Sequence, residues 1–197
     1  MNSLYNFIVK PFNERYDNIK KIGDDSLIIN TSIENHVFVS KKAVVCAIPA
    51  AFSTLINVGD EVYIHHNVFR RWYDQKQNQR NSSSFFKEDM YFVSPDQIYM
   101  YNNKSHLDYC FIKPILNKDY LKNRKEQPNI GVVKYTNNKL KTLGISPGDL
   151  ITFTPNSEFE FIIEGERLYC MKSNDIALVN EYEGNEKENN PSWAQSH

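Results

Sequence analysis

Short apolar stretches rich in Ile, Val, Tyr and Phe, separated by turn-forming residues, make up most of the chain. No segment keeps the 3.6-residue period of a capped amphipathic helix, and the longest candidate, 117–127, is polar all round. The pattern therefore predicts an all-β protein. The predicted strands are 5–10, 43–48, 61–65, 90–93, 97–101, 109–113, 132–135, 150–153, 159–163, 167–171 and 176–179.

The strand motifs occur twice, in the same order, which indicates a tandem repeat. Phe7-Ile8-Val9-Lys10-Pro11 resembles Cys110-Phe111-Ile112-Lys113-Pro114, and Val44-Val45 resembles Val132-Val133. Val58-Gly59-Asp60-Glu61-Val62 resembles Pro147-Gly148-Asp149-Leu150-Ile151, where each Gly-Asp predicts a turn. Glu88, Tyr91 and Asp96-Gln97-Ile98 resemble Glu166, Tyr169 and Asn174-Asp175-Ile176. The polar stretch 102–108 separates the two halves.

The halves differ in the length between their first two strands. Lys10 and Val44 are 34 positions apart, whereas Lys113 and Val132 are 19 apart, so the first half carries about 15 extra residues. The aliphatic run Leu27-Ile28-Ile29 lies in this extra length, between polar flanks. It is either a further strand of the sheet or an apolar anchor that is buried in another protein. Because only one half has it, closing the fold does not require it, and we favour a functional loop.

The ordered motifs resemble the GroES-type co-chaperonin family, whose members form ring-shaped lids on chaperonin chambers. The first half supplies the strand ending in Lys10-Pro11, the loop with Leu27-Ile28-Ile29 and the Gly59-Asp60 turn. The second half supplies Lys113-Pro114, the Gly148-Asp149 turn and the closing Asp175-Ile176. The resemblance covers residues 5 to 180. The missing second loop, the short 47–57 segment and the added 69–86 segment depart from the family and favour a viral tandem form over a plastid-like one.

The resemblance implies two tandem GroES-like β-barrels. The first, 1–101, carries a mobile loop at about 17–36 and an added hairpin or loop at about 67–87. A linker, 102–108, leads to the second barrel, 109–180, which lacks the loop. The acidic tail, 181–197, carries four Glu between 181 and 188 and is expected to be disordered.

The function implied by the resemblance is that of a co-chaperonin, without catalysis, cofactor or metal. Leu27, Ile28 and Ile29 would dock in a GroEL-type chaperonin ring and assist ATP-dependent protein folding. In the family, rings form when the terminal strand of one subunit pairs with the first strand of the next. The expected assembly strands therefore contain Phe7, Ile8 and Val9, and Ile176 and Leu178, in a homo-oligomeric ring.

Two other functions stay open from the residues. One is a viral structural or assembly β-barrel protein. The other is a barrel that binds single-stranded nucleic acid, because 69–73 and Lys76, Arg80 and Lys87 mix aromatics with cations. The solvated-hairpin interpretation of that segment is favoured, since the net charge of −1 supplies no overall basic field.

The remaining chemistry argues against an enzyme. The sequence contains no nucleophile elbow, phosphate-binding loop or HExxH motif. His65 and His66, as neighbours on a strand, are predicted to point to opposite faces and so cannot chelate one ion. Three scattered cysteines, Cys46, Cys110 and Cys170, favour a reducing compartment over a disulfide framework. With no secretory signal and no apolar span in the sequence, we expect a cytoplasmic protein, in the host cytoplasm if viral.

Overall fold

The computed structural model describes residues 3–16, 19–22, 25–28, 38–117, 126–181, 184 and 186–196, with the backbone alone at 19–22, 25–28 and 196. Two compact units make up the chain, unit 1 (Met1–Asn102) and unit 2 (Asn103–His197). Their boundary falls inside the polar stretch 102–108. Among the described residues, no helix is long and apolar enough to cross a membrane.

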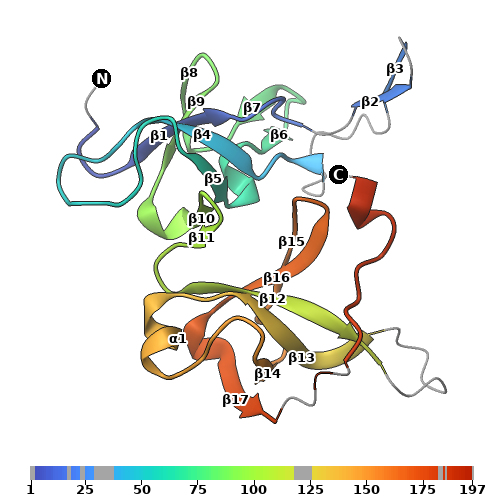
Figure 1. The fold of residues 1–197 in the computed structure, drawn as a ribbon. Helices are drawn as coiled ribbons and strands as arrows, with labels where there is room; N and C mark the ends of the chain where they lie inside the picture. Colours follow the sequence, from blue (N-terminus) through green and yellow to red (C-terminus); the bar gives the residue numbers. More distant parts are fainter. Residues whose placement is uncertain are drawn as a thin grey trace. The chain divides into compact units, whose positions relative to one another are not determined.

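Antiparallel strands dominate both units, so the prediction of a β protein is confirmed (Figure 1). None of the described sheets closes into a barrel. The strands up to the boundary are β1 (Phe7–Pro11), β2 (Ile19–Ile22), β3 (Asp25–Ile28), β4 (Lys42–Ala47), β5 (Glu61–Ile64), β6 (Arg71–Tyr73), β7 (Gln79–Asn81), β8 (Phe85–Lys87), β9 (Met90–Val93) and β10 (Ile98–Tyr101). Those after it are β11 (Lys104–Ser105), β12 (Tyr109–Leu116), β13 (Glu126–Tyr135), β14 (Leu150–Phe153), β15 (Phe159–Ile163), β16 (Glu166–Lys172) and β17 (Ile176–Asn180).

Each unit is built on one main sheet. In unit 1 the strand order is β10-β5-β4-β1-β9-β8, and the two-residue β11 lengthens this sheet at the β10 edge. In unit 2 the order is β15-β16-β12-β13-β14-β17. Alternate residues of each strand point to one face, and these form the core of each unit. The main core of unit 1 includes Phe7, Val9, Val45, Val62 and Tyr91, and that of unit 2 includes Cys110, Ile112, Val133, Ile151 and Tyr169.

The repeat in the sequence is a repeat in strand register. In unit 1, Val9 pairs with Val45 and Lys10 with Val44; in unit 2, Ile112 pairs with Val133 and Lys113 with Val132. Both ladders shift register just before these pairs, between Ile8 and Val9 and between Phe111 and Ile112. On the other side of the first strand, Val9 faces Tyr91 and Ile112 faces Tyr169. The matched motifs therefore occupy matched positions in the two sheets.

The two Gly-Asp turns have the same hydrogen bonds. The carboxylates of Asp60 and Asp149 each accept from the backbone N–H three residues earlier, at 2.8 Å in both cases. Gly59 and Gly148 donate to the carbonyls of Val45 and Val133, again at 2.8 Å. Their φ angles of +95° and +101° belong to the left-handed region that favours glycine. The predicted turns are confirmed at both positions.

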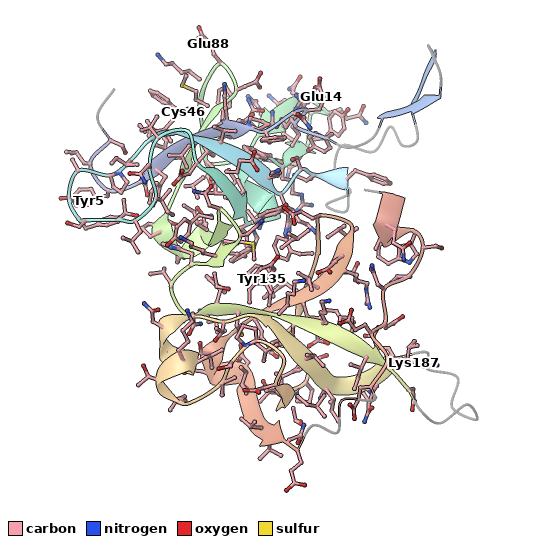
Figure 2. All side chains as sticks on the ribbon, viewed as in Figure 1. Tyr5, Glu14, Cys46, Glu88, Tyr135 and Lys187 are labelled. Atoms are coloured by element: carbon pink, nitrogen blue, oxygen red, sulfur yellow. The ribbon has the colours of Figure 1, made fainter. Side chains whose placement is uncertain are left out.

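The ends of the two units also match, with one exception. The short 3₁₀ helices η3 (Pro95–Gln97) and η4 (Ser173–Asp175) lead directly into β10 and β17. The side chains of Gln97 and Asp175 each accept a backbone N–H at 3.1 Å, from Ser94 and Lys172 respectively. The exception is Glu88, which stands at the tip of the β8–β9 turn (Figure 2), whereas Glu166 lies within β16.

Several elements were not predicted from the sequence. Besides β2, β3, β8 and β11, these are the five-residue helix α1 (Asn138–Thr142) and the 3₁₀ segments η2 (His66–Val68) and η5 (Ala194–Ser196), whereas β6 and β7 lie where a hairpin or loop was predicted. The side-chain oxygen of Asn137 caps α1 by accepting from the Leu140 N–H, and its amide donates to the Tyr109 carbonyl. An element of five residues is shorter than the window in which a helical period can be recognised.

Candidate functional site

The extra length of unit 1 leaves the fold through a buried neck. Tyr16 and Val39 form an antiparallel bridge, and the Ser40 N–H donates to the Arg15 carbonyl at 3.1 Å. All four side chains are buried. The chain therefore departs from the neck and returns to it at two adjacent, fixed points of the backbone. We call the segment between these points, 17–38, the docking loop.

Arg15 ties the neck to the added segment. Its guanidinium donates to the carbonyls of Phe69 and Arg70, at 2.5 and 3.2 Å, and to the side-chain oxygen of Asn81 at 2.8 Å. The Tyr16 hydroxyl accepts from the Arg71 N–H at 2.6 Å. Burial lowers the pKa of Arg15, but the guanidinium stays charged at neutral pH. Sequence periodicity did not single out Arg15 or Tyr16, because a buried arginine is recognised only by the carbonyls that surround it.

The predicted anchor residues lie partly within the described backbone. Leu27 and Ile28 belong to β3, where Leu27 pairs with Lys20 and Ile28 with Ile19 of β2. This hairpin is a two-stranded sheet of its own, so the alternative that the run is a strand of the main sheet is wrong for Leu27 and Ile28. Ile29 lies outside the described residues.

Of the two predicted assembly strands, one is central in its sheet and the other lies at an edge. β1, which holds Phe7, Ile8 and Val9, is a central strand with β4 on one side and β9 on the other, and all three side chains are buried. The prediction that it offers a free edge is therefore wrong, because its backbone groups are already used within the unit. β17 is the last strand of its sheet in the described part of the chain. There Ile176 packs on the core, while Leu178 is 61% exposed.

The segment added to unit 1 is a hairpin. β6 and β7 pair through Arg71–Asn81, Trp72–Arg80 and Tyr73–Gln79. Further along the segment, β8 joins the edge of the main sheet beside β9. The ring of Phe85 packs edge-on against Tyr91 at 5.6 Å between centroids, and Phe86 packs on Phe92 at 4.8 Å. The aromatics of β8 thus pack on their own unit while staying 38% exposed, and Trp72 and Tyr73 of β6 are also exposed.

His65 and His66 lie differently from the sequence prediction. The chain turns into η2 after His65, so the two rings stack at 4.4 Å instead of pointing to opposite faces. The His65 Nδ1 accepts from the Asn67 N–H at 3.1 Å. In the part of the chain that the structure describes, no group of three or more His, Cys, Asp or Glu side chains could hold a metal ion.

The three cysteines are free thiols, two of them deep in unit 2. Burial raises the pKa of Cys110 to about 12 and that of Cys170 well above its usual value. Both therefore stay protonated at neutral pH, and a protonated buried thiol is a poor nucleophile.

The C-terminal tail of unit 2 differs from the disordered tail that its composition predicts. We call residues 186–196 the strap. Its backbone runs beside the end of β12: the Leu116 N–H donates to the Lys187 carbonyl at 2.7 Å, and the Asn189 N–H donates to Pro114 at 2.8 Å. Farther on, the Asn190 side chain accepts from the Arg167 N–H, and Ala194 is fully buried. Backbone and side-chain partners from β12 and β16 hold this polar segment in place.

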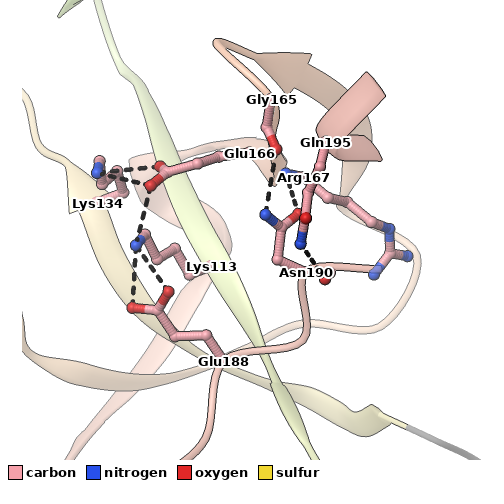
Figure 3. A network of polar contacts seen from close by, with 8 residues as sticks. All are labelled: Lys113, Lys134, Gly165, Glu166, Arg167, Glu188, Asn190 and Gln195. Carbon is pink, nitrogen blue, oxygen red and sulfur yellow. Dashed lines mark hydrogen bonds and ion pairs between the residues drawn. The ribbon is translucent and has the colours of Figure 1, made fainter. Parts of the chain in front are cut away.

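Ion pairs fasten the strap to the sheet (Figure 3). Lys113 contacts Glu188 at 2.8 Å and Glu166 at 3.4 Å, and Lys134 contacts Glu166 at 3.0 Å. Burial alone would lower the pKa of Lys113, but Glu188 and Glu166 outweigh it and raise that pKa. Burial alone would raise the pKa of Glu166, but Lys134 and Lys113 hold it below its ordinary value.

A second polar cluster lies at the loop end of the β12–β13 hairpin, where Glu126 faces Leu116. Arg167 donates to Glu126 at 2.6 Å, to Glu160 at 2.7 Å and to the Tyr169 hydroxyl at 2.7 Å. The Tyr169 hydroxyl also donates to Glu126. Burial opposes the charge of Arg167, but the two carboxylates outweigh it and raise the Arg167 pKa. Of these residues, Glu126 and Tyr169 line an open cleft of about 620 Å³, together with Pro128, Asn129, Phe153 and Glu158.

No family model matches the chain, and no curated protein matches it. The features that bear on function are the repeated sheet, the docking loop of unit 1 and the edge of β17, which has no further partner strand in the described part of the chain.

Proposed function

We propose that this protein is a co-chaperonin built from two GroES-like barrels, of which only the first engages a chaperonin ring. The observation that carries the proposal is the asymmetry between two matched units. Their ladders, turns and closing strands correspond residue by residue, yet only unit 1 inserts 22 residues between its neck positions Tyr16 and Val39. In unit 2 the facing residues Leu116 and Glu126 leave nine residues between them.

The docking loop has the composition of a segment that is ordered by its partner. Burying Leu27, Ile28 and Ile29 would contribute roughly 5–9 kcal/mol, at about 1.5–3 kcal/mol each. Fixing the backbone costs about 1–2 kcal/mol per residue, so a fully flexible 10-residue loop would lose more than its anchors return. The β2–β3 pairing supports the proposal, because a hairpin already formed in part lowers this cost. Several loops on one ring raise the effective concentration further.

The outer edge of β17, which pairs with no further strand among the described residues, supports assembly into a homo-oligomer. An unpaired strand edge with exposed apolar residues is a site for pairing with another chain. Since β1 is already paired on both sides, the partner of this edge would be a segment other than β1. The same edge would also serve the alternative function, a viral structural protein that assembles through its strands.

A refolding assay tests the proposal. A chaperonin ring with ATP is given a denatured substrate protein, with and without this chain. The expected result is a higher yield of refolded substrate, a changed ATPase rate and co-elution of the chain with the ring only when nucleotide is present. An unchanged yield and ATPase rate, with no co-elution under any nucleotide condition, would contradict the proposal. Sedimentation with virus particles would instead support the structural alternative.

A further inference from the structure

We propose that the β6–β7 hairpin is a second docking element of unit 1, which binds an acidic protein surface beside the groove that receives the docking loop. This inference rests on the proposed function, because the partner is the same chaperonin ring. It assigns a role to an added segment for which the resemblance to co-chaperonins supplies none.

The hairpin and the docking loop share one anchor. Tyr16 is the last neck residue before the loop, and its hydroxyl accepts from the Arg71 N–H at the start of β6. Arg15, one residue earlier, holds the carbonyl of Phe69 before β6 and the side chain of Asn81 at the end of β7. Both strands of the hairpin are therefore fixed at the point where the loop leaves the unit. A protein that binds the loop would therefore also lie close to the hairpin.

The exposed surface of the hairpin suits a protein partner. Trp72 is 45% exposed and Tyr73 is 49% exposed, and exposed Trp, Tyr and Arg are the residue types that contribute most at protein interfaces. The hairpin segment, 71–81, contains three cationic side chains and one carboxylate, in a chain whose net charge is −1. That carboxylate, Asp74, is engaged within the hairpin. The charge left for a partner is positive, which complements an acidic surface.

The hairpin keeps a defined shape without a partner. The Asp74 carboxylate accepts from the backbone N–H groups of Lys76 and Asn78, at 2.9 and 2.8 Å, and from Arg80 at 3.0 Å. The Asp74 N–H donates to the Asn78 carbonyl, which closes the turn. Such preorganisation lowers the entropy lost on binding, so a small contact can still contribute to affinity.

The geometry favours a protein over a single nucleic-acid strand. Trp72 and Tyr73 are adjacent in one strand, so their side chains leave opposite faces of the hairpin. Successive bases stack on aromatics that share one face along a groove. The aromatics of β8, which could extend such a track, pack instead on Tyr91 and Phe92.

Binding of the full-length chain to a GroEL-type chaperonin ring in the presence of nucleotide, measured at two salt concentrations, tests the inference. We expect Trp72→Ala to raise Kd about tenfold. We expect Lys76→Glu to raise Kd several-fold at low salt and less at high salt, because exposed charges are screened. The matched controls are Trp193→Ala, an exposed tryptophan of unit 2, and Lys104→Glu, an exposed lysine of unit 2, and both should stay within twofold of the parent chain.

The outcomes separate this inference from the proposed function. If the parent chain does not bind the ring, the proposed function fails, and this inference fails with it. If the parent chain binds and both hairpin variants match their controls, the hairpin is not a docking element, while the proposed function stands. If Trp72→Ala instead abolishes binding to a labelled single-stranded oligonucleotide and leaves chaperonin affinity unchanged, the partner is nucleic acid and the inference is overturned. Near-ultraviolet circular dichroism checks that Trp72→Ala is folded, and Lys76→Glu provides the test if it is not.

Discussion

Each unit places a guanidinium over a tyrosine at a matched position, but the arginine comes from a different chain segment in each unit. Tyr91 and Tyr169 occupy matched positions, and the guanidinium carbons of Arg15 and Arg167 lie 5.0 and 4.9 Å from their ring centroids. In unit 1 the arginine comes from the neck of the docking loop. In unit 2 it comes from β16 itself, two residues before the tyrosine. The repeat thus keeps the charge above the ring while the chain segment that supplies it differs.

The partners of these arginines show what each unit stabilises. Arg15 uses its donors on carbonyls and an amide of the added segment, so it joins the docking loop to the β6–β7 hairpin. Arg167 uses its donors on Glu126, Glu160 and Tyr169, all within unit 2. The Tyr91 hydroxyl has no hydrogen-bond partner among the described residues, whereas the Tyr169 hydroxyl has two. In unit 1 the arginine therefore joins two added segments, and in unit 2 it joins strands of one sheet.

The largest expected effect concerns binding. Replacing Leu27, Ile28 and Ile29 together with Ser should abolish co-elution with a chaperonin ring and leave the melting temperature of unit 1 nearly unchanged. The reason is that β2–β3, which holds Leu27 and Ile28, is a two-stranded sheet separate from the main sheet, so we expect the substitutions to open no cavity in the core. A thermal melt followed by circular dichroism checks this. A loss of several kcal/mol, as truncation of core aliphatics causes, would show that the run is packed in the unit.

The next largest effect is a difference in stability between matched positions of the two units. Ala43 of unit 1 corresponds to Gly131 of unit 2, since these residues face Pro11 and Pro114. A Cβ at Gly131 would lie 2.5 Å from the Lys113 carbonyl oxygen, so Gly131→Ala forces the backbone to shift. We expect a loss of about 3 kcal/mol in unit 2, whereas Ala43→Gly in unit 1 should cost about 1 kcal/mol. Chemical denaturation measures both, and equal costs would contradict the close packing at Gly131.

Removal of the strap should destabilise unit 2 alone. Deleting residues 186–197 removes two backbone hydrogen bonds to β12, the Glu188 ion pair and the buried Ala194. We therefore expect the free energy of unfolding of unit 2 to fall by about 2–3 kcal/mol. With Trp193 deleted, the fluorescence of Trp72 follows unit 1 and should not change. Lys187→Ala is the control, because Lys187 contributes its carbonyl to the contact with Leu116. An unchanged melt of unit 2 after the deletion would show that the strap adds no stability.

Smaller, equal effects are expected at the two Gly-Asp turns. No heavy atom lies within 4 Å of a Cβ built on Gly59 or Gly148, so the cost of alanine at either position comes from the positive φ alone. Gly59→Ala and Gly148→Ala should each lower the free energy of unfolding of their unit by about 1–2 kcal/mol, and the two values should agree to within about 0.5 kcal/mol. Unequal values from matched denaturation curves would mean that the turns are less alike than their hydrogen bonds.

The smallest effect is the response to acid. Burial lowers the pKa of His65 in unit 1 and of His106 in unit 2, so the folded state resists their protonation and each unit loses stability as the pH falls below 6.5. Unit 2 should lose more below pH 4.5, because the lowered pKa of Glu166 stabilises the folded state only while Glu166 is ionised. Since Glu166 is partly exposed, we expect less than about 1 kcal/mol from this group. In a Trp72→Phe variant, the fluorescence of Trp193 during denaturation at pH 7, 5 and 3.5 follows unit 2.

The positions of the main strands along the chain and the two Gly-Asp turns could be predicted from the sequence, because both depend on local signals. Alternation of Val, Ile, Tyr and Phe marks a half-buried strand, and a Gly-Asp pair between two such runs marks a turn with positive φ. Each predicted strand overlaps an observed one. The two halves also share enough side chains, such as Lys10-Pro11 and Lys113-Pro114, for the repeat to be recognised from the sequence, and these pairs hold matched positions in the two ladders.

The tertiary structure alone decided which strands are edges, what holds the neck of the loop and where the tail lies. β1 begins with the continuous apolar run Phe7-Ile8-Val9, and only its pairing with both β4 and β9 makes it a central strand. Arg15 and the polar residues of the strap carry no periodic signal, because their partners are carbonyls and side chains more than 20 residues away in the chain. Such long-range contacts form only when the sheets bring distant segments of the backbone together. For that reason the composition of the tail predicted a disordered segment.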